Sequence, residues 1–367
     1  MKVRLGDYIE EYSVRNKKGE DIPVYSVTNT QGFCKDYFGK EVASKDKTTY
    51  KIVPRGCFAF NPSRINVGSV DWQRNEERVI VSPLYNVFSV SEQLDQQYLY
   101  YYLKSDFALQ RIRAVATGSV RDNLKLAMLY EFPIELPEIT EQRIIVDKLD
   151  RVKQIISLRE KEVQALDDLI KARFVEMFGD PVDNPIGWKT KTLQELVSDD
   201  CTISYGIVQT GDDQEEGIPV FRPVDIVNHI PVRTELKRTT EEISSRYKRT
   251  ILKGREMLIT VRANIADTCI VGEEFVGCNV GRGIVPIRTK EDEMVLEFLK
   301  YQIDSKHLND NIKALAKGIT LIQLNMEDLR EISLIVPPIE IQKVYVEFTK
   351  QVDKSKQARE YSGKLAA

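Results

Sequence analysis

The sequence predicts an α+β protein made of two tandem globular domains joined by a long antiparallel two-helix coiled coil, an internal duplication with pseudo-twofold symmetry. Three observations lead to this fold class. The chain repeats itself at a distance of about 200 residues, each repeat ends in a helical segment, and each interior alternates short β-rich stretches with Gly, Pro and Asn turns. The 367 residues are enough for two or three domains with their own cores.

The repeat is most evident when residue n is set against residue n+200 from position 116 onward. The stretch ATGSVRDNLKLAMLYEFPIELPEITEQ then lies without a gap on AKGITLIQLNMEDLREISLIVPPIEIQ, and Gln142 meets Gln342. Upstream, YLYYYLKS at 98–105 falls on FLKYQIDS at 298–305. The stretches that match poorly are 29–90 and 226–290. Several ordered matches over a long span indicate a tandem duplication with a repeated framework and diverged interiors.

The order of elements is predicted from this framework. Short β-rich stretches such as CFAFNPS, VIVSPLYNVFSV, MLITV and GIVPIRT are separated by turn residues. We expect one amphipathic helix in each globular domain, near 95–113 and 291–315. The predicted domains are a globular domain at 1–139, a helix at 140–180, a second globular domain at 181–338 and a second helix at 339–367.

The first long helix carries a heptad seam, because apolar residues recur at alternating steps of four and three. The seam residues are Ile145, Leu149, Val152, Ile156, Val163, Leu166 and Ile170. Gly179 and Pro181 are stop signals. At 1.5 Å per residue, a helix over 140–177 is roughly 57 Å long.

The second helix is shorter and carries Val344, Phe348 and Val352. A heptad seam is also typical of a coiled coil between separate chains, and periodicity alone does not distinguish the two arrangements. Two similar seams in one chain favour antiparallel pairing within the chain, with the seam residues available for subunit docking.

Composition limits the class of protein. No apolar run approaches the roughly 20 residues that cross a bilayer, and the first residues lack the apolar region of a secretory signal. Five cysteines form no CxxC pair, which argues against a disulfide framework or a zinc site and favours the cytoplasm.

The net charge is −3, with 19 Lys and Arg against 18 Asp and Glu in residues 1–139 and 20 against 25 in residues 181–338. A nucleic-acid surface would therefore need clustered basic residues.

The sequence contains no motif for a catalytic centre. The GxxxxGK[ST] phosphate loop is absent, and His229 and His307 have no partner at metal-ligand spacing, so we expect no metal site. The stretch NPSR at 61–64 lacks the second Pro and the aromatic ring of the amino-methyltransferase motif that holds a flipped base. We therefore expect a protein that is not an enzyme.

The duplicated pattern resembles the specificity (S) subunits of Type I restriction-modification systems over essentially the whole chain. FPIELPEITEQRIIVDKLD and ISLIVPPIEIQKVYVEF look like the family's Pro-x-x-x-x-Gln entry into each conserved helix. FGDPVDNPIGWKTKTLQEL looks like its passage into a second target-recognition domain, and FAFNPSRINVGSV is similar to a stretch common in such domains.

The resemblance implies that the globular domains are two target-recognition domains, each reading one half of a bipartite, asymmetric DNA target. It implies that the helices form the coiled coil between them, set the spacing and dock two modification (methyltransferase) subunits. Those partners would carry S-adenosylmethionine and methylate adenine N6. With restriction subunits added, the assembly would cleave double-stranded DNA with ATP and Mg²⁺. The chain itself would hold no cofactor.

Candidate DNA contacts are basic and amide side chains near predicted turns. In the first domain they are Arg64, Asn66, Arg74, Arg121 and Asn123. In the second domain they are Arg246, Lys248, Arg249, Arg262 and Asn264. The alternative for each of these side chains is a solvated surface group.

Two other classes of function remain open at this level. A coiled-coil scaffold for protein interactions without DNA binding would fit the acidic net charge. A hydrolase would need a polar constellation that the sequence does not offer.

Overall fold

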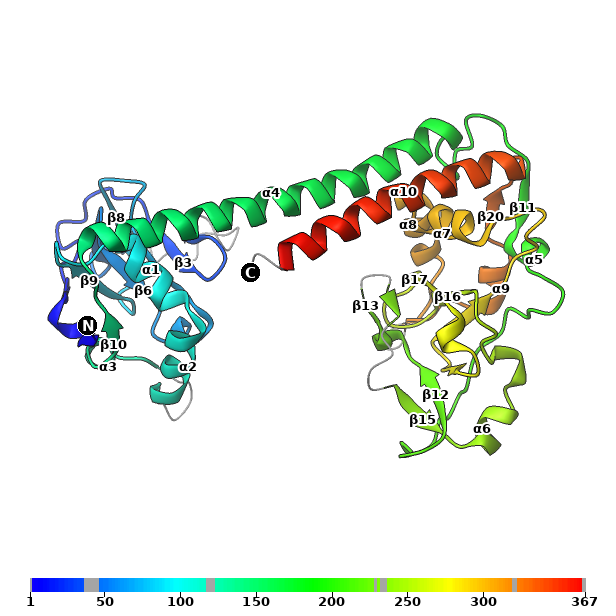
Figure 1. The fold of residues 1–367 in the computed structure, drawn as a ribbon, viewed down its shortest axis with the longest axis horizontal. Coiled ribbons are helices and arrows are strands. Elements are labelled where there is room, and N and C mark those ends of the chain that lie inside the picture. Colours follow the sequence, from blue (N-terminus) through cyan, green and yellow to red (C-terminus); the bar gives the residue numbers. More distant parts are fainter. Residues whose placement is uncertain are drawn as a thin grey trace. The chain divides into compact units, whose positions relative to one another are not determined.

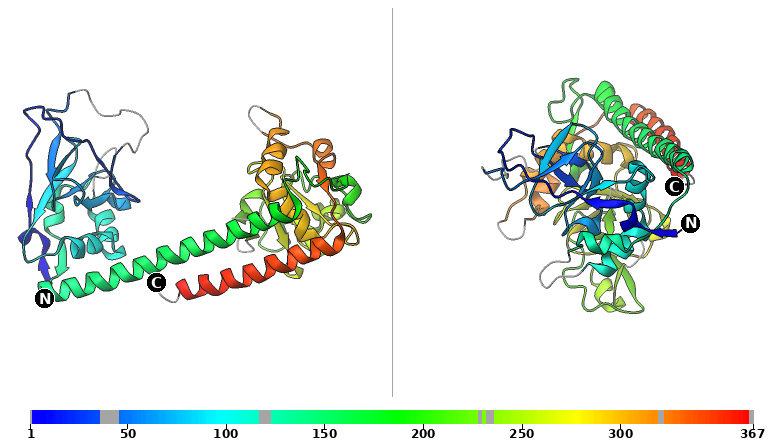
Figure 2. Two further views of the ribbon diagram at one scale, coloured as in Figure 1. Left: turned by 90° about the horizontal axis from the view of Figure 1, so that it is seen from above. Right: turned by 90° about the vertical axis from the view of Figure 1, so that its left-hand side faces the viewer.

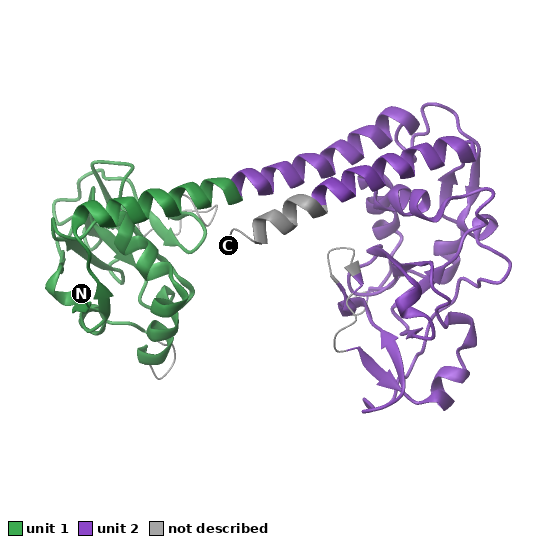
Figure 3. Ribbon diagram, in the orientation of Figure 1, with its two compact units in different colours: residues 1–156 green, residues 157–367 purple. Residues whose placement is uncertain are grey.

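The computed structural model of the chain describes residues 2–35, 46–116, 123–227, 230–231, 236–318 and 322–364, and of residues 227, 230 and 357–364 it describes the backbone alone. The chain divides into two compact units, residues 1–156 and 157–367 (Figure 3). Their boundary falls inside the first long helix, so that helix begins in unit 1 and ends in unit 2.

Unit 1 is a β-rich body with short helices, shown from blue to green in Figure 1. Its strands are β1 (Lys2–Arg4), β2 (Ile9–Glu11), β3 (Ser26–Thr28), β4 (Gly32–Cys34), β5 (Lys51–Pro54), β6 (Phe58–Phe60), β7 (Val70–Trp72), β8 (Arg78–Val81), β9 (Asn86–Val90) and β10 (Pro133–Glu135). Its helices are α1 (Gln96–Lys104), α2 (Asp106–Val115), α3 (Leu126–Tyr130) and the first part of α4 (Ile139–Phe178), with 3-10 turns η1 (Leu5–Asp7) and η2 (Ile65–Val67).

The main sheet of unit 1 has the antiparallel order β2-β9-β6-β7. Its β6 reads FAF, and all three of these residues are buried, as expected for a strand covered on both faces. Phe58 stacks on Phe88 of β9 with ring centroids 5.1 Å apart. The core therefore lies around β6. Because this strand is buried, the start of the loop that follows it is held in place by core packing.

Unit 2 has the same kinds of elements. Its strands are β11 (Thr190–Thr192), β12 (Ile218–Phe221), β13 (Ile226–Val227), β14 (Ile230–Pro231), β15 (Lys237–Thr239), β16 (Glu256–Thr260), β17 (Thr268–Val271), β18 (Asn279–Val280), β19 (Ile284–Ile287) and β20 (Ser333–Ile335). Its helices are the last part of α4, α5 (Leu193–Leu196), α6 (Glu241–Ser245), α7 (Leu296–Asp304), α8 (Lys306–Ala314), α9 (Met326–Arg330) and α10 (Ile339–Lys364), with 3-10 turns η3 (Pro223–Asp225), η4 (Lys248–Thr250) and η5 (Glu273–Phe275). The central sheet is β17-β16-β19, and every residue of β16 is buried.

Matching backbone contacts bear out the duplication. The first strand of each unit pairs antiparallel with its last strand, β1 with β10 and β11 with β20. Leu124 N donates to Pro62 O at 3.1 Å in unit 1, and Leu324 N donates to Val261 O at 3.0 Å in unit 2. The segments after β6 and β16 are therefore structurally equivalent, although their sequences diverge.

The pair of successive helices in each unit corrects one expectation. Instead of a single helix near 95–113 and 291–315, each unit has two helices, α1 and α2 or α7 and α8. The break falls at Ser105 and Ser305, whose backbones are extended and whose hydroxyls donate to the preceding turn at 2.7 Å. Serine competes locally for backbone hydrogen bonds, which interrupts a helix that apolar periodicity alone would continue.

Long helices are present at Ile139–Phe178 and Ile339–Lys364, where the sequence predicts helices at 140–180 and 339–367. In unit 2, α10 lies beside the last part of α4 and runs in the opposite direction (Figures 1 and 2). Tyr345 Oη donates to Ile170 O at 3.1 Å, and Lys356 forms an ion pair with Asp167 at 2.5 Å. Phe174 packs edge-on against Tyr345. These contacts fix the pairing of the helices inside unit 2.

The predicted seam residues divide into two groups. On the part of α4 in unit 2, Ile170 is buried and Val163 and Leu166 are half-buried. On the part in unit 1, Leu149 and Val152 are 39% and 36% exposed. The other two seam residues of that part, Ile145 and Ile156, are half-buried. A partner helix for these four unit 1 residues stays a prediction.

On α10, Phe348 is half-buried and Val352 is buried, whereas Val344 is 59% exposed. The position that faces α4 is taken by Tyr345, which is fully buried. The apolar seam of α10 therefore runs from Tyr345 to Phe348, a spacing of three residues. The predicted seam runs from Val344 to Phe348, a spacing of four. As a docking residue, Val344 stays a prediction.

None of the helices in the described part of the chain combines the length and apolar character needed to span a membrane. Cys34 is half-buried, and the other four cysteines are buried.

Candidate nucleic-acid interface

The loop after β16 in unit 2 has a strained and well-supported backbone. Ala263 and Ala266 have φ angles of 59° and 64°, a left-handed conformation that residues with a Cβ rarely adopt. Ala266 N donates to Thr260 O at 2.8 Å, and Asn309 Nδ2 donates to Ala266 O at 3.0 Å. Strained backbone of this kind persists only where the surroundings over-determine it, and it is common at functional sites. This loop carries two of the predicted contacts, Arg262 and Asn264.

Arg262 belongs to a short chain of hydrogen bonds. Its Nε donates to Gln323 Oε1 at 2.7 Å, and its Nη2 donates to the same oxygen. Gln323 Nε2 in turn donates to Tyr205 Oη. All three side chains are half-buried, so the chain of bonds is partly shielded from water and partly open to it. The guanidinium is therefore held in one orientation by neutral groups.

A second cation lies beside this chain of bonds. The Arg282 guanidinium is 5.9 Å from the centroid of the Tyr205 ring. Within the described residues, neither Arg262 nor Arg282 has a carboxylate within 4.0 Å. Positive charge without a neutralising partner, next to an aromatic ring, is suited to contact nucleic acid.

The equivalent place in unit 1 carries different chemistry. Because Pro62 matches Val261 by its hydrogen bond, Ser63 is the counterpart of Arg262, and Asn123 is the counterpart of Gln323. Ser63 Oγ donates to Asn123 Oδ1 at 2.6 Å. In each unit, a side chain of the loop after β6 or β16 is hydrogen-bonded to a side-chain amide. That amide comes shortly before α3 in unit 1 and shortly before α9 in unit 2. The framework of the contact is repeated and its residues differ.

The other predicted contacts of unit 1 lie in two groups, one in the loop after β6 and η2 and one around Tyr100. Arg64 is exposed on the same loop as Ser63. Asn66 lies in η2, where its side-chain oxygen is buried without a hydrogen-bond partner and its backbone oxygen accepts from Arg113 Nε at 3.1 Å. Arg121 lies outside the described residues.

Arg74 belongs to a cluster around Tyr100 that no sequence motif indicates. Its guanidinium is 4.5 Å from the ring of Trp72 and 5.7 Å from that of Tyr100, and it is paired with Asp71. Lys104 and Lys153 approach the Tyr100 ring at 5.7 and 5.6 Å. The residues of this cluster lie in or shortly after β7, in α1 and in α4, and no sequence spacing indicates that these elements meet. Three cations with one paired carboxylate can contact phosphates.

Burial and local charge alter the pKa values in this cluster. Burial raises the pKa of the Tyr100 hydroxyl, and the Asp71 carboxylate contributes to that rise. Burial lowers the pKa of Lys104, while the nearby Asp71 raises it. The ammonium of Lys104 also donates to Asn29 O at 2.9 Å and to Gly68 O at 2.5 Å, which links the cluster to the loop after β6.

The remaining predicted contacts of unit 2 are separate from the Arg262 loop. Arg246 comes directly after α6 and is paired with Glu242. Lys248 and Arg249 are exposed in η4. No contact between these three residues and Arg262 occurs in the part of the chain that the structure describes. Asn264 is exposed at the tip of the Arg262 loop.

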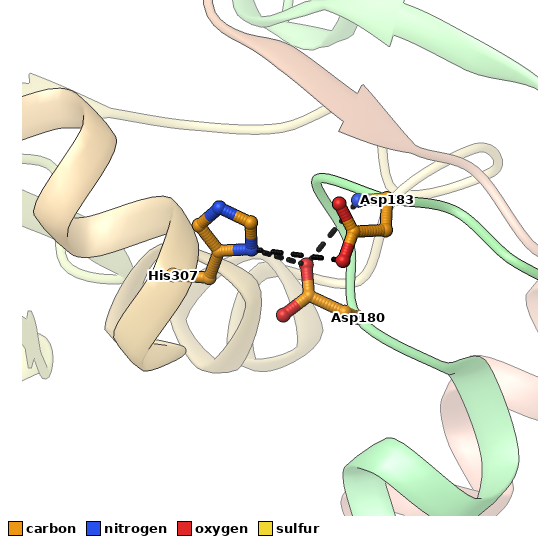
Figure 4. Close-up of side chains that lie close together, drawn as sticks. All are labelled: Asp180, Asp183 and His307. Carbon is orange, nitrogen blue, oxygen red and sulfur yellow. Dashed lines mark hydrogen bonds and ion pairs between the residues drawn. The ribbon is translucent and has the colours of Figure 1, made fainter.

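A group of ligand-type side chains lies where α4 ends. Asp180, Asp183 and His307 each bring one ligand atom within 4.8 Å of the others (Figure 4). Asp180 Oδ1 lies 3.2 Å from His307 Nδ1 and already accepts from the backbone N–H of Val182 at 2.8 Å. No sequence spacing indicates this group, because His307 is 127 residues from Asp180. Its position indicates a contact that ties α8 to the turn after α4.

Comparison with known proteins identifies the family to which this chain belongs. The family model described as "Type I restriction modification DNA specificity domain" matches twice, over residues 3–167 and 185–362. These two matches cover nearly the whole chain, and the chain belongs to this family.

Individual relatives agree with this assignment. The chain is 25% identical over 267 residues to the Type I restriction enzyme EcoBI specificity subunit of Escherichia coli. That match covers 66% of this chain and 56% of the subunit, so the chain spans little more than half the length of this curated relative.

Two solved structures share the fold. One, from a study of complex assembly and conformational transition of the type I R-M system, has a TM-score of 0.64 at 20% identity and covers 100% of this chain and 94% of its own. The S subunit of a Type I restriction-modification system from M. genitalium has a TM-score of 0.52 at 13% identity, with coverages of 100% and 92%.

Proposed function

We propose that this chain is the DNA-sequence-specificity subunit of a Type I restriction-modification complex. Each globular domain, 1–139 and 181–338, reads one half of a bipartite, asymmetric target. The helices at 140–180 and 339–367 pair as an antiparallel coiled coil, set the spacing and dock two modification subunits. The chain is not itself an enzyme. Its partners carry S-adenosylmethionine and methylate adenine N6, and restriction subunits, where they join, use ATP and Mg²⁺.

One observation carries the proposal. The two units repeat a framework down to single hydrogen bonds, yet the equivalent loops after β6 and β16 carry different side chains, Ser63 and Arg262. A repeated framework offers equivalent docking surfaces to two identical partners. Diverged loops on that framework let the two half-sites differ, as an asymmetric target requires.

The test is reconstitution of the complex. The chain is co-expressed with a modification subunit of a Type I system, and the purified complex is assayed for adenine methylation on a library of duplexes. We expect methylation confined to one bipartite sequence, and binding whose log affinity falls linearly with log salt concentration. A complex that neither binds nor methylates any bipartite duplex contradicts the proposal.

The acidic net charge favours a second candidate, a protein-interaction scaffold without DNA binding. Replacing Arg64, Lys248 and Arg262 together with Ala separates the two functions. A specificity subunit loses affinity for the duplex, and a scaffold loses nothing. The matched control removes the same charge at Lys17, Lys18 and Lys306, which are exposed and lie outside the candidate contacts.

A further inference from the structure

The Arg262 guanidinium keeps one hydrogen-bonding edge unused. Arginine has five N–H donors in a planar fork and no acceptor. Gln323 Oε1 takes the Nε donor and one Nη2 donor, which form one edge of the fork. The other edge, made by Nη1 and the second Nη2 donor, has no hydrogen-bond partner among the described residues. Two parallel donors are therefore presented together.

The neighbouring groups hold this edge in place without cancelling its charge. Gln323 is neutral, and its amide orientation is set at both ends, by Arg262 on its oxygen and by Tyr205 on its nitrogen. The main chain adds a further restraint, because residues 262 and 323 form an antiparallel backbone bridge. A side chain fixed at several points loses little conformational entropy when it binds.

Two adjacent donors on a rigid cation select a particular ligand. Guanine presents two acceptors, N7 and O6, side by side in the major groove, whereas adenine presents one acceptor and one donor. The two N–H donors of arginine therefore pair with both guanine acceptors. At adenine, one of these N–H donors faces the N6 amino group, which is also a donor. Phosphate also offers paired acceptors, but an exposed cation such as Lys248 suffices for it.

From this geometry we infer that Arg262 reads a guanine in the half-site of unit 2, with Gln323 and Tyr205 as its positioning residues. This inference rests on the proposed function. The counterpart pair in unit 1, Ser63 and Asn123, contains no cation, so the equivalent base of the other half-site is read by a different chemistry.

The experiment uses the reconstituted complex and the target sequence found with the unaltered chain. Duplexes carrying each of the four base pairs at every position are compared for the chain with Arg262→Ala, Arg262→Lys and Gln323→Ala. We expect Arg262→Ala to abolish a G·C preference at one position of one half-site, a loss on the order of 10- to 100-fold in discrimination. Arg262→Lys keeps the charge without the fork, so it should retain most of the affinity and lose that preference.

Gln323→Ala should weaken the same preference without moving it to another position. Gln323→Glu keeps the acceptor oxygen that orients the fork but neutralises its charge, so it should restore part of the preference and lower the affinity for all duplexes. The matched control is Ser63→Ala, the counterpart position, which should alter preference only in the other half-site. Lys248→Ala should weaken all duplexes equally.

The inference is overturned in two ways. If Arg262→Ala weakens every duplex by the same factor, Arg262 contacts phosphate. If the unaltered chain shows no G·C preference in the half-site of unit 2, no guanine is read there. Both outcomes are compatible with the proposed function as a specificity subunit. That function is contradicted only if the unaltered complex fails to select any bipartite duplex.

Discussion

Each of the repeat-equivalent glutamines, Gln142 and Gln342, makes three hydrogen bonds to backbone atoms where a long helix begins. Gln342 Oε1 accepts from Val295 N at 2.9 Å, and its Nε2 donates to Glu293 O at 2.9 Å and to Pro337 O at 2.8 Å. Gln142 bonds in the same way in unit 1. Both side chains are 0% exposed, so water cannot replace these bonds.

Replacing Gln342 with Ala should therefore destabilise unit 2 by about 1–3 kcal/mol, because buried backbone groups lose their partners. Gln142→Ala should cost unit 1 a similar amount. The measurement is the free energy of unfolding in urea, monitored by a probe in each unit. An exposed neighbour on the same helix turn, Lys343→Ala, is the control, and equal stability of Lys343→Ala and Gln342→Ala would contradict this role.

At this scale the sequence predicts residues better than contacts. The repeat identifies Gln142 and Gln342 as equivalent, and Arg262 and Asn123 are predicted from residue type near turns. The bonds from Arg262 to Gln323 and from Ser63 to Asn123 join residues 61 and 60 positions apart. Such contacts depend on how strands bring loops together, and no spacing rule contains that information.

At the scale of elements, the long helices agree closely with their apolar periodicity. The prediction of 140–177 compares with Ile139–Phe178 for α4. Periodicity predicts less well which side of α10 faces α4. Val344 and Tyr345 are adjacent, and either residue fits a heptad seam. Packing decides between them, since only Tyr345 reaches the cluster of Phe174, Phe178 and Phe298.

This phase gives a prediction with a built-in control. Tyr345→Ala removes a fully buried ring and should destabilise unit 2 by about 3–5 kcal/mol. Val344→Ala, one residue earlier and 59% exposed, should change the free energy of unfolding by no more than about 0.5 kcal/mol. Tyr345→Phe keeps the ring and loses the bond to Ile170 O, at a cost of about 0.5–1.5 kcal/mol.

Thermal or urea unfolding of the three variants checks this order. If Val344→Ala were as destabilising as Tyr345→Ala, α10 would pack through the phase that the sequence alone predicts.

At the scale of the whole molecule, α4 is the element that both units share, and in the proposed complex its length sets the distance between half-sites. Residues 150–155 of α4 are all exposed, so extra residues can enter there without disturbing a core. Inserting four helix-forming residues between Gln154 and Ile155 lengthens the helix by roughly 6 Å and rotates its remaining C-terminal part by about 40°.

Because base pairs are stacked about 3.4 Å apart, the preferred spacer between the half-sites should grow by one to two base pairs. The bases read in each half-site should stay the same, since the loops after β6 and β16 are unaltered. The measurement is methylation by the reconstituted complex on duplexes whose half-sites are separated by spacers of increasing length. The same four residues inserted between the exposed Glu215 and Glu216 serve as the control and should leave the spacing unchanged. An α4 insertion that leaves the preferred spacer unchanged would mean that the partner subunits, and not this helix, measure the distance along DNA.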